Sequence, residues 1–384
     1  MSAEIIRVPD FLRDWPWQRS INPLYEQVRT ESEAWVRSFG ILNPKSQAAF
    51  DRCKIESDSC DLAKLAALSY SYHDRTYLRL GTDLMFLLYL HDEQTDVEDA
   101  DTTRKLGDIF IDALRNPAKP RPQGEAPIGE IGRQFSARLH KAATPTALTH
   151  FLDEMEAYIY SVVDQSTERQ QNHIRSIADY FALRRLTGAG LPSFALIEAG
   201  MHIPEDVFRH PLLARMREAA AISLCFTNDV YSYNVERAKG HALHNLIPTV
   251  MHEKGLPLQS AIDWIGAWHD EHVVAEFLAC QAELEKLTFG SADVDRLVRL
   301  YVHGLACWIR GADDWSFECE RYFGREAAQV REERVVRMFP AFDVARADVV
   351  ETEGEKGLVR ELVEKGVAGL QIEMESAAGG VLVQ

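Results

Sequence analysis

The sequence has few of the features that mark membrane-spanning, disulfide-bonded or nucleic-acid-binding proteins. No apolar run reaches the roughly 18 residues that a membrane helix needs, so no membrane span is expected. The six cysteines form no CxxC pair and no tight cluster, which favours free thiols in a reducing compartment over a structural zinc site. With 59 acidic and 42 basic residues the formal net charge is −17, which disfavours a nucleic-acid partner.

Signals for secretion and for β-sheet are also scarce. The first residues, MSAEIIRVPDFLRDWPW, lack a basic segment followed by an apolar core, so we expect no secretory signal and a cytoplasmic protein. Sustained apolar/polar alternation is nearly absent, and there is no Asn-Gly hairpin. Apolar residues instead recur at helical spacing, which predicts an all-α protein built as one bundle of about ten helices.

Proline, glycine and charge divide the chain into three predicted parts. Residues 1–20, with Pro9 and Pro16, are expected to form an irregular arm, residues 21–340 the single domain, and residues 341–384 a mobile acidic tail. Within the domain, helices are predicted near residues 23–39, 46–56, 60–71, 76–98, 102–115, 128–142, 145–168, 174–200 (with a break at Gly188, Gly190 and Pro192), 210–240, 258–285 and 291–311.

One stretch, Leu84–Asp99, combines an apolar run with a cluster of acids. It reads LMFLLYLHDEQTDVED, uncharged through His91 and then rich in carboxylates. On a helix, Asp92 and Asp96 lie four residues apart and project from one face. Taken alone, the stretch fits two interpretations equally: an apolar site whose substrate has a cation-bound polar head, and a core helix with a solvated end.

A second polar motif favours the first interpretation. Asn228, Ser232 and Glu236 follow one another at intervals of four, so one helix face presents an amide oxygen, a hydroxyl and a carboxylate. These are the oxygen ligands that Mg²⁺ prefers. Such spacing is also common on solvated faces, but here the apolar run AAAISLCFT precedes the motif and indicates a buried helix. Polar groups at the end of such a run need partners or a metal, because unpaired burial is costly.

With both motifs in view, the sequence resembles the class I terpene synthases, particularly those of fungi. Asp92-Glu93-Gln94-Thr95-Asp96 is similar to the family's aspartate-rich motif, with glutamate where many members have a second aspartate, and residues 228–236 match its N-D-x-x-S-x-x-x-E motif completely. The resemblance implies a bundle with a central apolar cavity. It also implies that the two motifs face each other across the cavity mouth and bind three Mg²⁺ ions, with Mn²⁺ as a substitute, that hold a substrate diphosphate.

The resemblance also suggests residues that contact the diphosphate. By the family's spacing, Arg184 is the diphosphate sensor, Thr187 the linker and Gly188 the effector carbonyl at a helix break; the choice of Arg184 over Arg185 rests on spacing alone. Further diphosphate-binding positions matched to the family are Lys239, Arg321 and Tyr322. Taken singly, each basic residue is more simply a surface charge, but their joint placement around two metal motifs weakens that interpretation.

Apolar and aromatic residues near these motifs are candidates for the cavity wall. Aromatic faces can stabilise a carbocation through their quadrupoles, and an apolar wall excludes water. The candidates are Met85, Leu88, Tyr89, Trp308 and Trp315, of which Trp308 is the strongest. For any one aromatic residue, ordinary core packing is the more common role. His91 is interpreted as a packing histidine rather than a general base.

The resemblance implies an enzyme that ionises a linear prenyl diphosphate. Farnesyl diphosphate is the favoured substrate and a sesquiterpene hydrocarbon or alcohol the favoured product, in a monomer or homodimer. An acyclic alcohol synthase of the linalool or nerolidol type, acting on geranyl or farnesyl diphosphate, and a ring-closing enzyme of the protoilludene type both fit the motifs. A chain-elongating prenyl diphosphate synthase would need a second aspartate-rich motif in place of residues 228–236. A non-catalytic helical binding protein would not need the intact motifs.

Overall fold

The structure is a computed structural model that describes residues 4–40, 61–95, 98–171, 174–240 and 242–340. Within these ranges the side chains of Glu93, Arg169, Gln170, Gln171 and Leu243 are not described. The helix expected at 46–56, the tail expected from residue 341 and the candidate metal ligand Asp96 lie outside the described residues. The division into arm, domain and tail therefore stays a prediction.

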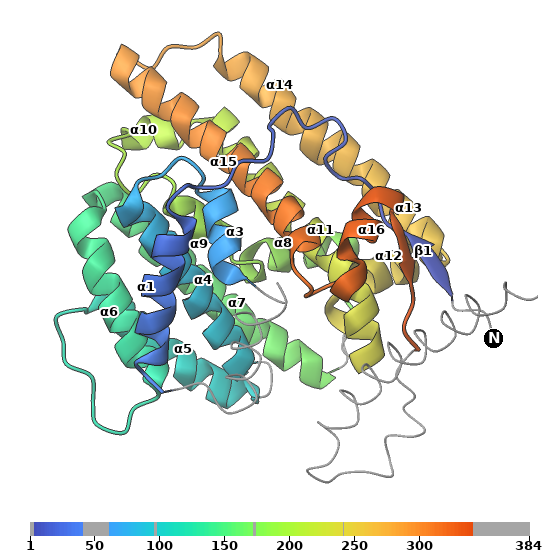
Figure 1. The fold of residues 1–384 in the computed structure, drawn as a ribbon, viewed down its shortest axis with the longest axis horizontal. Coiled ribbons are helices and arrows are strands. Elements are labelled where there is room, and N and C mark those ends of the chain that lie inside the picture. Colours follow the sequence, from blue (N-terminus) through green and yellow to red (C-terminus); the bar gives the residue numbers. More distant parts are fainter. Residues whose placement is uncertain (1–3, 41–60, 96–97, 172–173, 241, 341–384) are drawn as a thin grey trace, which may run out of the picture.

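The described chain is a bundle of helices with one very small sheet, so the predicted all-α fold class is confirmed (Figure 1). The helices are α1 (Tyr25–Arg37), α3 (Leu62–Ser69), α4 (Arg75–Thr95), α5 (Ala100–Arg115), α6 (Pro127–Ala142), α7 (Pro145–Gln171), α8 (Ile177–Thr187), α9 (Gly190–Ala195), α10 (Glu205–Phe208), α11 (Pro211–Lys239), α12 (Leu246–Lys254), α13 (Leu258–His269), α14 (Ala275–Leu284), α15 (Ala292–Glu318) and α16 (Ala327–Glu333). A π turn, Asp270–Val274, joins α13 to α14, and 3₁₀ turns span Ala242–His244 and Gly324–Glu326.

The sequence did not predict the two strands. β1 (Ile5–Arg7) lies in the expected arm and pairs antiparallel with β2 (Val335–Arg337), so that Ile6 faces Val336 in the register. Each strand has only three residues, which is too short for an alternating pattern to be visible. The pairing places the beginning of the described chain beside its end.

Several helices begin where a short polar side chain binds an unpaired N–H of the first turn. Asp99 accepts from the N–H of Thr102 at the start of α5, and Ser176 from that of Asp179 at the start of α8. Asn245 accepts from the N–H of Ile247 at the start of α12. Pro211 begins α11 at a position where the missing N–H costs nothing. Local sequence therefore sets where the helices around the candidate site begin.

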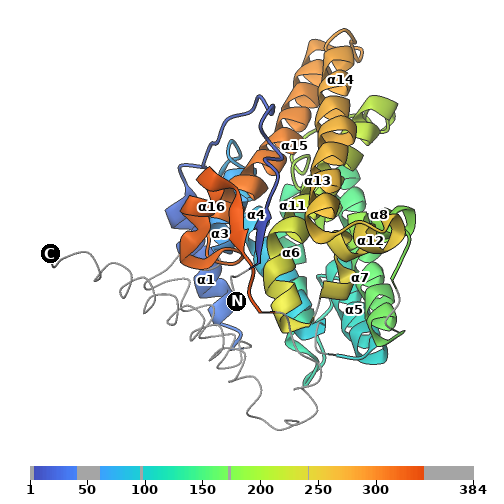
Figure 2. The same ribbon diagram turned by 90° about the vertical axis from the view of Figure 1, so that its right-hand side faces the viewer.

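Helix α11 lies at the centre of the bundle. It contacts α8, α9, α12, α14 and α15, and Figures 1 and 2 show it beside α14 and the long helix α15. Leu213, Met216, Phe226 and Tyr231 of α11 are almost completely buried. The motif at residues 228–236 is thus carried by a core helix, as the apolar run before it predicted. No described helix combines the length and low polarity that crossing a bilayer requires.

Helices α3 and α15 approach each other closely because small residues line their contact. A Cβ added at Gly311 would lie 2.8 Å from the backbone carbon of Leu68 and 2.8 Å from the backbone nitrogen of Ser69. About two turns earlier on the same face, a Cβ at Gly304 would meet Ile197 and the Tyr72 hydroxyl at 2.5 Å. The α3 side contributes the buried alanines Ala66 and Ala67. Backbone-to-backbone contact therefore fixes where α15 sits.

We predict that Gly311→Ala lowers the free energy of unfolding by about 1–3 kcal/mol, because the added methyl meets backbone atoms that cannot rotate away. Chemical denaturation measures the change. The matched control is Gly129→Ala in α6, where the three atoms nearest to the methyl belong to the side chains of Glu125 and Ile109 rather than to backbone. There the gain in helix propensity, up to about 1 kcal/mol, should offset the crowding. Equal losses in both variants would contradict the close-contact explanation.

Candidate active site

Asp92 stands in the last turn of α4, where a tyrosine of α7 binds it. The Tyr158 hydroxyl donates to the Asp92 carboxylate at 2.6 Å, and Tyr158 itself is 1% exposed. Asp92 is exposed, so its carboxylate also reaches solvent. Its predicted partner Asp96 lies outside the described residues. Tyr158 was not predicted, because residues so distant in sequence give no local signal of contact.

His91, next to Asp92, is a packing residue in this structure, as expected. It is 1% exposed and its ring lies 5.6 Å from the rings of both Phe110 and Tyr158. Burial lowers the pKa of His91 to about 4. At neutral pH the imidazole is therefore uncharged and enclosed within the core.

The second candidate metal face lies along the C-terminal part of α11. Asn228, Ser232 and Glu236 succeed one another at one-turn intervals, and Ser232 is buried. Burial raises the pKa of the Glu236 carboxyl, and the Asn245 amide donates to this carboxyl at 3.0 Å. The Ser232 hydroxyl interacts with Glu236 and has no further hydrogen-bond partner among the described residues. An amide oxygen, a hydroxyl and a carboxylate along one face form a donor set that fits a hard divalent cation.

Arg184, the predicted sensor, joins this face through a buried network. Its Nε donates to Asp229 at 2.9 Å and its Nη2 to the Asn228 amide oxygen at 2.6 Å. Burial alone would lower the pKa of Arg184, but attraction to the Asp229 carboxylate raises it well above its ordinary value. The guanidinium is thus charged and held against the first residue of the metal face.

Asp229 is the hub of this network, a role that the sequence did not reveal. Besides Arg184, its carboxylate accepts from the Tyr180 hydroxyl and from the backbone N–H of Leu246 at 3.3 Å. The Asn245 amide also donates to the Asp229 carbonyl at 2.7 Å. Asp229 is 2% exposed. It therefore ties α8, α11 and the start of α12 together, and only its place inside the motif could have suggested it.

The geometry separates the two adjacent arginines. The side chain of Arg184 is 16% exposed and pairs with a buried carboxylate. Arg185 is 41% exposed and pairs at 3.0 Å with Glu218, which is 42% exposed. Arg184 faces the candidate site and Arg185 faces solvent, so the structure favours the arginine that spacing had selected.

The chain breaks between α8 and α9 at the predicted position. Helix α8 ends at Thr187, Gly188 follows with its N–H bonded to the Arg184 carbonyl at 2.8 Å, and Ala189 takes a left-handed φ of 54°. A Cβ on Gly188 would lie 2.7 Å from the Cys225 sulfur. Pro192 does not cause the break, because it lies in the first turn of α9, where a proline is tolerated.

The remaining diphosphate candidates lie on or beside the C-terminal half of α11. Tyr322 is buried and its hydroxyl accepts from the Asn228 amide at 2.8 Å, which joins Arg184, Asn228 and Tyr322 in one chain of contacts. Arg321 is exposed, with its guanidinium 5.9 Å from the centre of the Tyr322 ring. Lys239 is exposed at the last position of α11.

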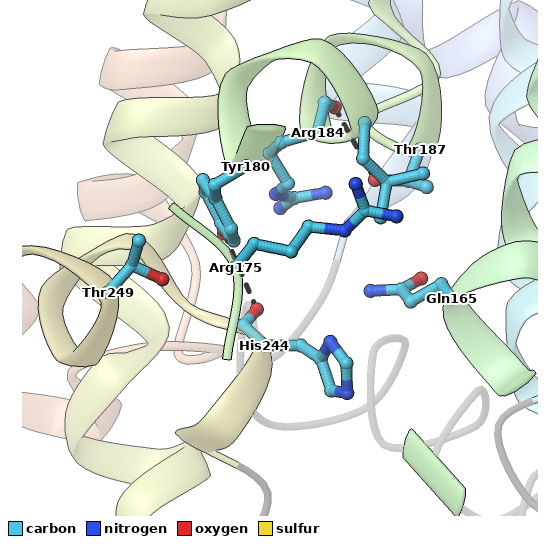
Figure 3. Close-up of a pocket in the computed structure, with 8 residues that line it drawn as sticks. Gln165, Arg175, Tyr180, Arg184, Thr187, His244 and Thr249 are labelled. Atoms are coloured by element: carbon cyan, nitrogen blue, oxygen red, sulfur yellow. Dashed lines mark hydrogen bonds between the residues drawn. The ribbon is translucent and has the colours of Figure 1, made fainter. Parts of the chain in front are cut away.

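A small pocket opens beside Arg184 (Figure 3). Figure 3 shows Arg184, Thr187, Arg175, Gln165 and His244 around one space, with Tyr180 and Thr249 on its other side. Two arginines line it, and each is paired with a carboxylate, Arg175 with Glu168 and Arg184 with Asp229. Gln165 lies on α7 seven residues after Tyr158, so one face of α7 extends from the Asp92 side of the site to the Arg184 side.

The predicted cavity-wall residues lie in the core rather than in this pocket. Met85, Leu88, Trp308 and Trp315 are all less than 9% exposed, and Tyr89 is partly buried. The Trp308 ring packs against Tyr70 at 5.2 Å and Phe194 at 6.0 Å. Trp315 lies edge-on to Tyr322 at 5.9 Å and donates to the Asp61 carbonyl at 2.7 Å. Trp315 therefore contacts a candidate site residue, and a role of the set as cavity wall stays a prediction.

Comparison with known proteins finds one family model and several relatives that are similar in sequence to this chain. Residues 83–274 match the model of terpene synthase family 2, C-terminal metal binding. A Δ(6)-protoilludene synthase of Stereum hirsutum is 40% identical over 87% of this chain and 88% of its own length. A sesquiterpene synthase of Cyclocybe aegerita is 40% identical over 88% of each chain.

Solved structures with similar folds have lower sequence identity. A variant of cucumene synthase superposes with a TM-score of 0.68 at 23% identity, over 80% of this chain and 99% of that one. The linalool/nerolidol synthase of Streptomyces clavuligerus, in complex with 2-fluorogeranyl diphosphate, gives a TM-score of 0.69 at 21% identity, over 80% and 99%. At these identities the likeness shows the fold alone.

We predict that Arg184→Ala lowers the free energy of unfolding by about 3–5 kcal/mol, because it leaves the Asp229 carboxylate buried without its cation. Arg185→Ala is the matched control and should cost less than about 0.5 kcal/mol, since its ion pair is exposed. Chemical denaturation compares the two. Combining Arg184→Met with Asp229→Asn should cost less than the sum of the single changes; additive losses would show that the two charges are not coupled.

Proposed function

The chain belongs to the class I terpene synthases, in terpene synthase family 2, and we propose that it ionises farnesyl diphosphate with Mg²⁺ to form a sesquiterpene. The products are free diphosphate and a sesquiterpene hydrocarbon or alcohol, as expected of a carbon–oxygen lyase acting on phosphates. Relatives named as sesquiterpene synthases, which align over nearly 90% of this chain, support the C₁₅ substrate.

One observation carries the proposal: the oxygen ligands of α11 adjoin a buried guanidinium. Asn228 provides the contact, because its amide oxygen accepts from Arg184 and its amide nitrogen donates to Tyr322. A cation-binding face and an anion-binding group therefore meet at one residue. That arrangement suits a ligand that brings metal ions and phosphate oxygens together.

In this proposal Asn228, Ser232 and Glu236 hold one Mg²⁺, and Asp92 with Asp96 holds the others of a set of three. Bound magnesium would stabilise the negative charge that develops on the departing diphosphate. The cationic and hydroxyl groups that donate hydrogen bonds to its oxygens are Arg184, Lys239, Arg321 and Tyr322. Asp229 holds Arg184 in place before substrate arrives, so little reorganisation is needed when the carbon–oxygen bond breaks.

The allyl cation left by that step must be kept from water. The proposed wall is formed by Met85, Leu88, Tyr89, Trp308 and Trp315. At the break after α8, Thr187 is the proposed linker and Gly188 the proposed effector carbonyl; the Thr187 hydroxyl and the Gly188 N–H both donate to the Arg184 carbonyl. A cytoplasmic location and a monomer or homodimer complete the proposal. The four described cysteines are buried and unbridged, which agrees with a reducing compartment.

We predict that the purified protein with Mg²⁺ releases diphosphate from farnesyl diphosphate fastest, and from geranyl and geranylgeranyl diphosphates more slowly. Release is measured colorimetrically and volatile products by mass spectrometry; a chelator should abolish both. Acyclic alcohols from geranyl diphosphate as the main product would instead establish a linalool-type enzyme. Condensation with isopentenyl diphosphate would establish chain elongation, and no diphosphate release from any substrate would overturn the proposal.

We predict that Asn228→Ala reduces kcat/KM for farnesyl diphosphate by at least about 100-fold, since it removes both a metal ligand and the partner of Arg184 and Tyr322. Circular dichroism should show unchanged helix content. The control is Asn116→Ala at the end of α5, where the exposed side chain donates to the Asp112 carboxylate of the same helix. Turnover by Asn228→Ala at the rate of this control would contradict the site assignment.

A further inference from the structure

The two-stranded sheet has an amide side chain at each of its edges. At the β1 edge, Gln259 of α13 accepts from the Arg7 N–H at 2.8 Å and donates to the Arg7 carbonyl at 3.0 Å. At the β2 edge, Asn234 of α11 donates to the Arg337 carbonyl at 3.0 Å and accepts from the Phe339 N–H at 2.8 Å. Each amide makes the two hydrogen bonds that the backbone of a further strand would make at that edge. The sheet is thus fastened to α13 on one side and to α11 on the other.

Asn234 lies inside the metal motif but is turned away from its metal face. It follows Ser232 by two residues and precedes Glu236 by two, so on a helix it projects roughly 160° from both. Its side chain is 5% exposed, and its amide NH₂ and oxygen bond to the backbone of the last residue of β2, Arg337, and of Phe339 just after it. One motif therefore serves two purposes: one face carries metal ligands, and the opposite face carries an anchor for the chain that follows Tyr322.

The segment 322–339 is attached to α11 at both ends. At its start, the Tyr322 hydroxyl accepts from Asn228; at its end, Arg337 and Phe339 bond to Asn234. The two attachment points are six residues apart on α11, or about 9 Å along the helix axis. Between them, the Phe323 ring lies 5.4 Å from Tyr231, which also belongs to α11. The segment therefore meets the motif at its start and at its end, whereas α16 between them packs against α15.

The first residues of the described chain strengthen the second attachment. Glu4 forms an ion pair with Arg237 of α11 at 2.9 Å, and its carbonyl accepts from the Met338 N–H at 2.8 Å. Glu4 and Arg237 are partly exposed, so this pair contributes little by itself. The buried amide of Asn234 is the stronger constraint, because its loss would leave backbone groups without partners.

We propose that Asn234 is a positioning residue of the diphosphate site. It holds segment 322–339 against α11. This fixes the position of Arg321 and Tyr322 relative to the metal face formed by Asn228, Ser232 and Glu236. This inference rests on the proposed function, since it assumes that Tyr322 and the motif bind one diphosphate. Asn234 touches neither metal nor substrate; it acts through the backbone that it holds.

The test compares Asn234→Ala with Gln259→Ala, which removes the same number of hydrogen bonds from the other edge of the same sheet. Asn234→Ala should weaken the binding of inorganic diphosphate in Mg²⁺ by about tenfold, as loss of two amide bonds would allow, and raise KM for farnesyl diphosphate similarly. Gln259→Ala should change both by less than about twofold, because α13 carries no ligand. Calorimetry measures the binding, and amide hydrogen exchange at residues 335–339 should quicken in both variants.

A second pair of variants leaves α11 untouched. Phe339→Pro removes the backbone N–H that donates a hydrogen bond to the Asn234 side chain, whereas Phe339→Ala keeps that N–H and removes only the ring. We expect Phe339→Pro to weaken diphosphate binding in the same direction as Asn234→Ala, and Phe339→Ala to weaken it less. This pair keeps the inference testable if Asn234→Ala does not fold.

The outcomes separate the inference from the proposed function. Failure of the unaltered protein to bind diphosphate with Mg²⁺ and to convert any prenyl diphosphate would overturn the proposed function. If the unaltered protein binds diphosphate normally, and Asn234→Ala and Gln259→Ala lose affinity equally, then Asn234 only stabilises the sheet. Unchanged affinity in both Asn234→Ala and Phe339→Pro would also refute the positioning role.

Discussion

A buried ion pair between Arg184 and Asp229 determines how the candidate site is put together. A charged pair removed from water is stable only if its remaining lone pairs and protons are bonded. Asn228, Tyr180 and the N–H of Leu246 supply those bonds, and they come from three different helices. Satisfying one buried pair therefore places α8, α11 and the start of α12 relative to one another. The helix break after Thr187 and the metal face of α11 are consequently held in a fixed relation.

Asn228 shows why an amide is well placed at the start of the metal face. A carboxylate there could accept from Arg184 but could not donate to Tyr322, whereas the amide does both. The neutral side chain also adds no further negative charge beside Asp229 and Glu236, whose carboxyls already lie close together in a low-dielectric setting. The amide thus links a guanidinium to a phenol, and its oxygen, which already accepts from Arg184, has one further lone pair that a cation could use.

Periodicity in the sequence was sufficient to predict the bundle and one face of the site. The intervals of four from Asn228 to Glu236, and the glycines after Thr187, are local patterns that fix a helix face and a break. Tyr158, Tyr180 and Asn245 were missed because each contacts the site from another element, and a single sequence does not show which distant residues meet. The strands were missed for the same reason: three residues carry no pattern, and their pairing depends on the opposite end of the described chain.

The pairing of Ile5 with Arg337 also has a consequence for synthesis of the protein. A contact that joins residues so far apart pays its full loop-closure cost before it gains anything, so such pairings form late in folding. At typical translation rates of about 5–20 residues per second, β1 leaves the ribosome roughly 15–70 s before β2 exists. During that time Ile6, which is 2% exposed in the finished fold, has no strand to pair with. The contacts of the two-stranded sheet with α11 are therefore completed only after nearly all the described chain has been made.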